Sequence, residues 1–209
     1  FRGEIQGEIL GMDVHVFNDK GESIKNKKGE LVCIKSFPTM PIKFWNDEKD
    51  NKYHNAYFNK YKGVWCHGDY ILKTDNNGYI IYGRSDSTLN PGGVRIGTAE
   101  IYRQVEQMEE VLEGLVVGQE WKEDTRVILF VRLADKIDFN KNLIDKIKKQ
   151  IRMGTSPRHV PAKVIKVRDI PRTKSGKIAE LTVRDLIHNK EIKNKTALAN
   201  PECLSFYKN

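Results

Sequence analysis

Apolar and polar positions alternate along the first third of the chain, which is the pattern of strands with one buried face. Met12, Val14 and Val16 alternate with polar neighbours before a turn at residues 18–21. Aromatic residues mix with Asn, Asp and Lys over residues 38–62, where we expect loops and one short helix. The pattern predicts strands over residues 12–17, 31–34 and 78–82.

The pattern changes after Asp86, where apolar residues recur every three or four positions, as on amphipathic helices. Such helices alternating with short apolar strands are typical of a small α+β domain. We therefore place a domain boundary at Asp86, between a β-rich segment over residues 1–85 and an α+β domain over residues 86–209. The pattern predicts helices over 99–112, 139–152 and 178–188, the first two capped by Thr98 and Asp138, and strands over 115–117, 127–131 and 163–168.

The 209 residues carry a net charge of +8, and most of the basic excess lies in the second half. Residues 87–209 hold 23 Lys and Arg against 16 Asp and Glu. A basic surface can bind nucleic acid or a phosphate-bearing small substrate, and it can also be an ordinary solvated surface. Charge by itself favours the solvated surface.

The placement of cysteine and histidine argues against metal and disulfide chemistry. The three cysteines are far apart and form no CxxC pair, and the five histidines lack metal-ligand spacing. We therefore expect no metal site and a reducing, cytoplasmic location. No apolar run approaches the roughly 20 residues of a membrane-spanning helix. The chain begins without Met or a signal-peptide pattern, as if cut from a longer protein.

Two polar residues in the first segment are suited to binding a nucleotide. Asp69 follows Gly68 at an expected turn after a strand, where a carboxylate can accept two hydrogen bonds from a ribose diol. Arg84 offers a fork of donors that fits phosphate or ribose oxygens. Each also has an ordinary interpretation, as a turn aspartate bonded to its own backbone or as a salt bridge between Arg84 and Asp86.

Two glycine-containing loops in the second segment could bring positive charge to an anion. Gly92 and Gly93 allow a close approach of the main chain to another surface, and Arg95 follows them. Lys177 ends a Ser-Gly-Lys tip, where an ammonium group could offset negative charge that builds during a reaction. Ordinary surface turns explain both loops as well. A Walker A loop is excluded, because Ile178 stands where Ser or Thr is required and the first glycine is absent.

The order and spacing of these motifs are more informative than any one of them. Residues 83–90 (GRSDSTLN), 97–101 (GTAEI) and 171–177 (PRTKSGK) resemble the hinge motif, its continuation and the catalytic-lysine loop of the acyl-CoA synthetase branch of the adenylate-forming superfamily. The resemblance covers nearly all of the chain. Within that branch, the subgroup that activates acetoacetate is the one most similar to residues 7–14, 40–47 and 195–202.

This resemblance implies an α+β fold in which residues 1–85 are the β-rich end of a large AMP-binding domain and residues 86–209 a small mobile lid. It implies a reaction in which an acid and ATP give an acyl-adenylate and pyrophosphate, and coenzyme A then gives the thioester and AMP. By position in the motifs, the resemblance assigns Lys177 to catalysis of adenylation and Asp86 to the hinge. It assigns nucleotide binding to Asp69, Arg84 and Arg95. It assigns coenzyme A binding to a Gly92–Gly93 strand and to Arg152.

The resemblance also implies the partners: acetoacetate, ATP with Mg²⁺ in the intact enzyme, coenzyme A, and an N-terminal portion of the same enzyme. The family's phosphate loop and acid pocket are not found in residues 1–209, so we expect this chain alone to be inactive. We expect neither nucleic acid nor membrane as a partner.

Two alternatives remain open. One is another short-chain acyl-CoA synthetase, of the acetyl or propionyl type, because the acid pocket is not part of the chain. The other is a basic nucleic-acid-binding module, since residues 136–209 hold 18 Lys and Arg against 7 Asp and Glu. Most aromatic residues precede residue 83, which is a poor arrangement for stacking bases over a positive groove.

Overall fold

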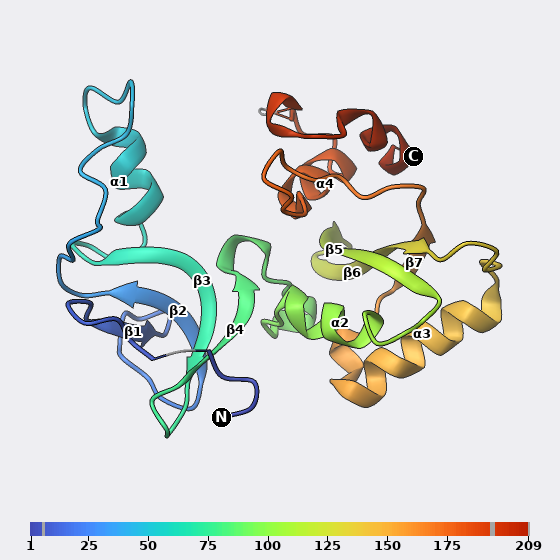
Figure 1. Cartoon of the computed structure of the whole chain (residues 1–209), viewed down its shortest axis with the longest axis horizontal. Helices are drawn as coiled ribbons and strands as arrows, with labels where there is room; N and C mark the ends of the chain where they lie inside the picture. The colour runs from blue at the N-terminus through green and yellow to red at the C-terminus, as the bar shows by residue number, and fades with distance from the viewer. Residues whose placement is uncertain (6, 193–194, 209) are drawn as a thin grey trace. The chain divides into compact units, whose positions relative to one another are not determined.

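The computed structural model describes residues 1–5, 7–192 and 195–208. The chain divides into two compact units, Phe1–Asp86 and Ser87–Asn209 (Figure 1). Both contain a sheet, and the helices and strands together make a mixed α+β fold, as the sequence predicts. Among the described residues, no helix has the length and apolar character needed to cross a membrane.

The first unit is built on an antiparallel sheet whose strands pair in chain order. Val16, Ile71 and Tyr79 form its buried core. A short helix lies in the loop-rich stretch and stacks Tyr57 on Trp65, with ring centroids 3.7 Å apart. The elements are β1 (Val14–Phe17), β2 (Lys28–Cys33), α1 (Asn51–Tyr57), β3 (Trp65–Lys73) and β4 (Tyr79–Arg84).

The second unit is a three-stranded sheet with helices on both faces (Figure 1). In this sheet β5 and β6 are antiparallel, and β7 joins β6 in parallel. The elements are α2 (Thr98–Val105), β5 (Val111–Trp121), β6 (Asp124–Leu133), α3 (Lys141–Gly154), β7 (Lys163–Lys166) and α4 (Glu180–Ile187), with 3₁₀ turns at η2 (Pro91–Gly93), η3 (Pro157–His159), η4 (Lys195–Ala197) and η5 (Pro201–Tyr207).

Successive side chains of a strand point to opposite faces, so β6 is apolar on both sides of the sheet. Val127, Leu129 and Val131 pack with the buried residues of α2 and α3. Ile128 and Phe130 pack on the other face, with α4 and the C-terminal turn η5. The sheet is therefore the middle layer of three.

The predicted N-caps of the first two helices and the predicted end of the first helix are wrong. The first helix ends at Val105 and not at residue 112, because the chain turns there and Val111 already begins β5. Its N-cap is Gly97, whose N–H donates to the Glu100 carboxylate at 2.9 Å. The second helix starts at Lys141, and Asn140 replaces the predicted Asp138 as its cap by accepting from the Leu143 N–H at 3.0 Å.

Candidate functional site

Asp69 and Arg84 lie directly opposite each other on β3 and β4. The predicted turn at Asp69 is wrong, since β3 continues through it to Lys73. An Arg84 Nη1 nitrogen lies 3.4 Å from Asp69 Oδ1, and it donates to the His67 carbonyl oxygen at 3.2 Å. His67 Nε2 lies 3.3 Å from the other Asp69 oxygen. The strand pairing therefore brings the two predicted nucleotide residues together.

Gly68 makes room for this arrangement. Its φ of +86° is one that residues with a side chain rarely adopt. A Cβ atom at Gly68 would come within 2.5 Å of Arg84 Nη2. The guanidinium group thus lies over the glycine, and any larger residue there would push it away.

Asp86, the predicted hinge residue, is the second carboxylate beside Arg84, with 3.4 Å between Arg84 Nε and Asp86 Oδ1. The ion pair considered from the sequence is therefore present. Burial alone would lower the pKa of Arg84, but the hydrogen bond and charge of Asp86, with Asp69 and Glu30, raise it overall. About half of the Arg84 side chain is exposed (52%), so a ligand can reach the guanidinium group.

The two glycines predicted to lie on a strand form a 3₁₀ turn instead, with φ of 58° at Gly92 and 74° at Gly93. The Gly92 N–H donates to both oxygens of Asp124, at 2.9 and 3.1 Å. This bond and a second one from the Thr125 N–H lower the pKa of the Asp124 carboxyl. Such a turn presents backbone and no Cβ to its surroundings.

Sequence reasoning missed Arg158, which contacts this glycine turn from η3. Its Nη1 nitrogen donates to the carbonyl oxygens of Pro91 and Gly92, each at 3.4 Å. The two segments are 66 residues apart in the chain, and no local pattern indicates that they meet. Arg158 therefore adds a positive charge to the segment that carries Arg95.

Two predicted arginines lie at exposed positions of the second unit. Arg95 follows the glycine turn and is exposed. Arg152 is exposed in the last turn of α3. An arginine at this position also has an ordinary explanation, because its charge interacts favourably with the C-terminus of the helix. No hydrogen bond or ion pair within the described part of the chain joins Arg152 to Lys177.

Lys177 lies on an exposed loop that closes on itself. The Thr173 N–H donates to the Lys177 carbonyl oxygen at 2.8 Å, and Thr173 Oγ1 accepts from the Lys177 N–H at 3.1 Å. Gly176 turns the chain with a φ of +84°. Within the described residues, the Lys177 side chain has no hydrogen-bond or ion-pair partner.

The loop is anchored on one side to β5. Arg172 donates from Nη1 to the Gly176 carbonyl oxygen at 2.7 Å and from Nη2 to Glu113 at 2.5 Å. Arg132 donates to the second Glu113 oxygen at 2.9 Å. Burial alone would raise the pKa of Glu113, but the bonds from Arg172 and Arg132 lower it overall. Glu113 thus ties the loop to the sheet.

The loop is anchored on its other side to the C-terminal segment. The Lys174 N–H donates to the Ala197 carbonyl oxygen at 2.9 Å, and the Ala199 N–H donates to the Arg172 carbonyl oxygen at 2.8 Å. Asn200 then accepts from the Arg172 N–H at 2.9 Å. The segment that indicates the subgroup in the sequence is therefore also the one that pairs with the lysine loop.

The structure thus groups Asp69, Arg84 and Asp86 in the first unit, while Lys177 and the other candidate residues lie in the second. Across residues 1–5, 7–192 and 195–208, no three His, Cys, Asp or Glu side chains are placed to hold a metal ion together. The three cysteines are buried and free.

Comparison with known proteins gives close relatives. No family model matches the chain. It is 59% identical over 207 residues to the acetoacetyl-coenzyme A synthetase of Rhizobium meliloti and 47% identical over 211 residues to the acetoacetyl-CoA synthetase of Xenopus tropicalis. These matches cover 99% and 100% of this chain, but 32% and 31% of the relatives. The chain therefore spans about a third of their length.

Solved structures agree. The acetoacetyl-CoA synthetase from Streptomyces lividans superposes with a TM-score of 0.92 at 42% identity, over 99% of this chain and 31% of that one. An anthranilate CoA ligase in complex with anthranoyl-AMP shares the fold, with a TM-score of 0.75 at 20% identity over 88% of this chain and 34% of the other. By sequence and structure together, the chain is homologous over its whole length to acetoacetyl-CoA synthetases and corresponds to a C-terminal part of them.

Proposed function

We propose that the intact protein joins acetoacetate to coenzyme A at the expense of ATP, through an acyl-adenylate, with release of pyrophosphate and AMP. The support is the identity to relatives that bear the acetoacetyl-CoA synthetase name. Magnesium would enter with the nucleotide. Residues 1–85 would be the end of the AMP-binding domain and residues 86–209 the lid.

The observation that carries this proposal is the Lys177 loop, which presents an exposed lysine from a backbone anchored on two sides. In the first step a carboxylate oxygen attacks the α-phosphorus of ATP and pyrophosphate leaves. Negative charge gathers on the phosphoryl oxygens during that attack. A lysine ammonium group held beside them lowers the barrier, because its charge is oriented before the reaction begins.

The second step needs different contacts. The thiol of coenzyme A attacks the adenylate carbonyl, the acyl C–O bond breaks, and AMP leaves with the electron pair on its phosphate oxygen. The bonds that change are now those of the acyl carbon and no longer those of the α-phosphorus, so Lys177 can withdraw. A lid that turns about Asp86 would exchange the lysine loop for the glycine turn. The division of the chain into compact units directly after Asp86 is consistent with that role.

The remaining residues would bind the ligands. Asp69 would accept hydrogen bonds from the ribose hydroxyls, and Arg84 and Arg95 would contact the nucleotide. The Gly92–Gly93 turn would let pantetheine pass close to the main chain, and Arg152 would meet a coenzyme A phosphate. Arg158, which is bonded to the glycine turn, would add to the positive charge there.

The test is Lys177→Ala in the intact enzyme, with Lys174→Ala as matched control from the same exposed loop. ATP–pyrophosphate exchange measures adenylation, and thioester formation from supplied acetoacetyl-adenylate measures the second step. We expect Lys177→Ala to abolish exchange and largely spare thioester formation, and Lys174→Ala to retain both. Equal loss of both steps in Lys177→Ala would refute the assigned role.

A second test concerns the chain by itself. We propose that the 209-residue chain does not catalyse adenylation, because the phosphate loop and acid pocket are not found in it. Pyrophosphate exchange by the purified chain above a Lys177→Ala background would contradict this.

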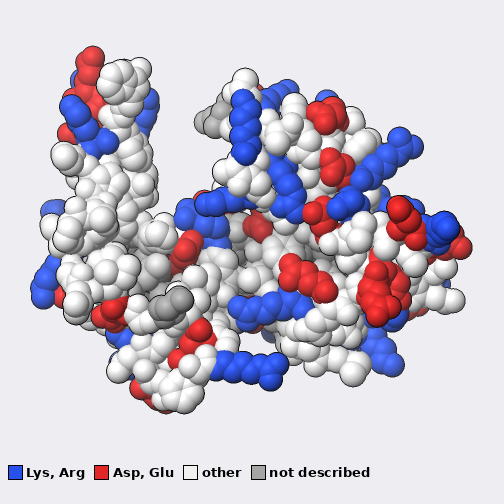
Figure 2. All heavy atoms as spheres, in the orientation of Figure 1, with Lys and Arg blue, Asp and Glu red and all other residues white. Residues whose placement is uncertain are grey.

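Two alternatives can be separated from the main proposal. Activity with acetate or propionate exceeding that with acetoacetate would indicate another short-chain synthetase. A salt-dependent affinity for single-stranded DNA would indicate a nucleic-acid module. On the face seen in Figure 2, basic and acidic side chains are interspersed and form no continuous basic stripe, which gives the nucleic-acid alternative no support there. We also propose a cytoplasmic location, with the free, buried cysteines as support.

A further inference from the structure

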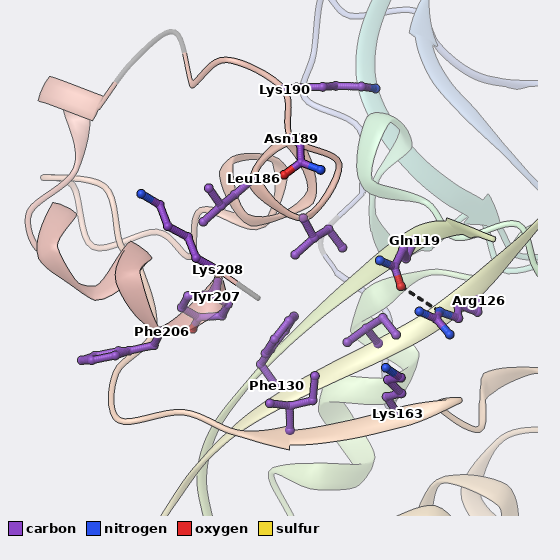
Figure 3. Close-up of a pocket in the computed structure, with 13 residues that line it drawn as sticks. Gln119, Arg126, Phe130, Lys163, Leu186, Asn189, Lys190, Phe206, Tyr207 and Lys208 are labelled. Carbon is purple, nitrogen blue, oxygen red and sulfur yellow. Dashed lines mark hydrogen bonds between the residues drawn. The ribbon is translucent and has the colours of Figure 1, made fainter.

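A hollow of about 460 Å³ lies in the second unit between one face of its sheet, helix α4 and the C-terminal turn η5 (Figure 3). Its volume is within the range of small-molecule sites in proteins. The lysine loop, the glycine turn and the arginines at positions 84, 95 and 152 do not contribute to its lining. The residues of the proposed function therefore leave this hollow unexplained.

The strand register explains how the floor of the hollow is built. Arg126, Ile128 and Phe130 are alternate residues of β6, so they share one face of the sheet. On β7, Lys163 pairs with Ile128 and Ile165 pairs with Phe130. The same face thus runs from a cationic end to an apolar end along both strands.

The apolar end is only partly closed by its cover. Leu186 and Ile187 of α4 pack against the buried core of this face but stay half-buried, as does Ile165 below them. Tyr207 closes the far side, with its ring 4.7 Å from that of Phe130. When an apolar ligand displaces water from the apolar side chains of an open hollow, the free energy of the system falls, which favours binding.

The cationic end is already ordered. Gln119 accepts a hydrogen bond from Arg126 Nε at 2.7 Å, drawn as a dashed line in Figure 3. The guanidinium group stacks on Trp121, with Cζ 3.7 Å from the ring centroid. Held in this way, its outward edge suits a carboxylate, which a guanidinium fork binds through two parallel hydrogen bonds.

The lining is also unbalanced in charge. It includes four basic residues and no acidic one. In the part of the chain that the structure describes, none of the lysines of the lining forms an ion pair. Figure 3 shows Arg126 and Lys163 at one end of the hollow and Phe206 and Tyr207 at the other. The basic residues are Arg126, Lys163, Lys190 and Lys208.

We propose that this hollow binds a carboxylate that carries an unbranched apolar chain. The carboxylate pairs with Arg126 and Lys163, and the chain lies over Ile128, Phe130 and Ile165 beneath α4. The inference goes beyond the proposed ligase reaction. It assigns a second, non-catalytic acid site to the lid unit.

The test is calorimetric titration of the intact protein with hexanoate, octanoate and decanoate. Saturating acetoacetate is present, and ATP and coenzyme A are left out, so that the substrate acid site is occupied and no turnover occurs. We expect one saturable site whose affinity rises about fourfold for each added methylene, as expected for burial of the chain. Decanol, which lacks the charge, should bind at least tenfold more weakly than decanoate.

The variant Arg126→Gln with Lys163→Gln should weaken decanoate binding at least tenfold without lowering the melting temperature or the ligase activity. Lys149→Gln is the matched control, since it removes an exposed charge from α3, on the opposite face of the sheet. Decanoate binding that is unchanged in the double variant, or equal to that of decanol, overturns the proposal. The absence of any saturable binding also overturns the proposal, including the case in which another part of the intact protein covers the hollow.

Discussion

The side chain of Asn200 ties the C-terminal segment to the start of the lysine loop. It accepts a hydrogen bond from the Arg172 N–H at 2.9 Å. It also donates to Asp169 Oδ2 at 2.5 Å and to the Ile170 carbonyl oxygen at 3.0 Å. The variant Asn200→Ala removes all three bonds and leaves an aspartate and a backbone N–H without this partner.

The magnitude follows from the kinds of bond. Each of the two neutral bonds contributes about 1 kcal/mol, and the bond to the carboxylate about 2 kcal/mol. Asn200 is half-buried, so water replaces part of what is lost. We expect Asn200→Ala to lower the free energy of unfolding of the second unit by about 2 kcal/mol, a change of about thirtyfold in the equilibrium constant.

Urea titration followed by circular dichroism measures the global effect, and hydrogen exchange of peptides from residues 171–178 measures local opening. Asn142→Ala is the matched control, because Asn142 is exposed on α3 and its side chain takes part in no hydrogen bond among the described residues. An unfolding free energy within about 0.5 kcal/mol of the wild type, with unchanged exchange in the loop, would refute the anchoring argument.

Three further outcomes are expected. Glu113→Gln should make the free energy of unfolding fall less steeply below about pH 5. The folded state lowers the pKa of the Glu113 carboxyl, so this group adds stability above its unfolded pKa, and that stability is lost as the pH falls through the folded pKa. Urea titrations of both proteins over a series of acidic pH values measure this, and parallel curves would contradict it. Gly68→Ala should lower stability by about 1–2 kcal/mol through its positive φ and weaken AMP binding by displacing Arg84, as calorimetry would detect. Asp86→Pro, which fixes φ near −65°, should slow one half-reaction at least tenfold more than Asp86→Ala, and equal rates would exclude a hinge there.

The strands and helices whose residues lie on the core faces could be predicted from the sequence. The continuous apolar run over 127–131 lies within β6. The apolar stripe of Leu143, Ile144, Ile147 and Ile151 lies on α3. The end of α2 could not be predicted in this way. Met108 is buried in the same core as the helix, so the apolar spacing continues past Val105 although the backbone has turned.

The sequence motifs predicted which residues belong to the candidate site, but they did not predict which of these residues contact one another. Strand pairing places Asp69 beside Arg84, and the sequence alone indicated only that each was suited to a nucleotide. Arg158 and Asn200 were missed because each acts through a contact with a distant part of the chain. Backbone pairing between residues 172–174 and 197–199 leaves no periodic signal in either segment.

The structure separates two properties of the lysine loop that the motif presents as one. Lys177 supplies the charge, and its side chain takes no part in anchoring the loop among the described residues. Arg172 and Asn200 supply the anchoring and lie at the base of the loop, away from its tip. A substitution at the tip therefore removes charge from an ordered backbone, whereas a substitution at Asn200 leaves the charge in place on a looser one. Since the catalytic effect of a fixed charge depends on its orientation before the reaction, both changes should slow the same adenylation step, and by different physical means.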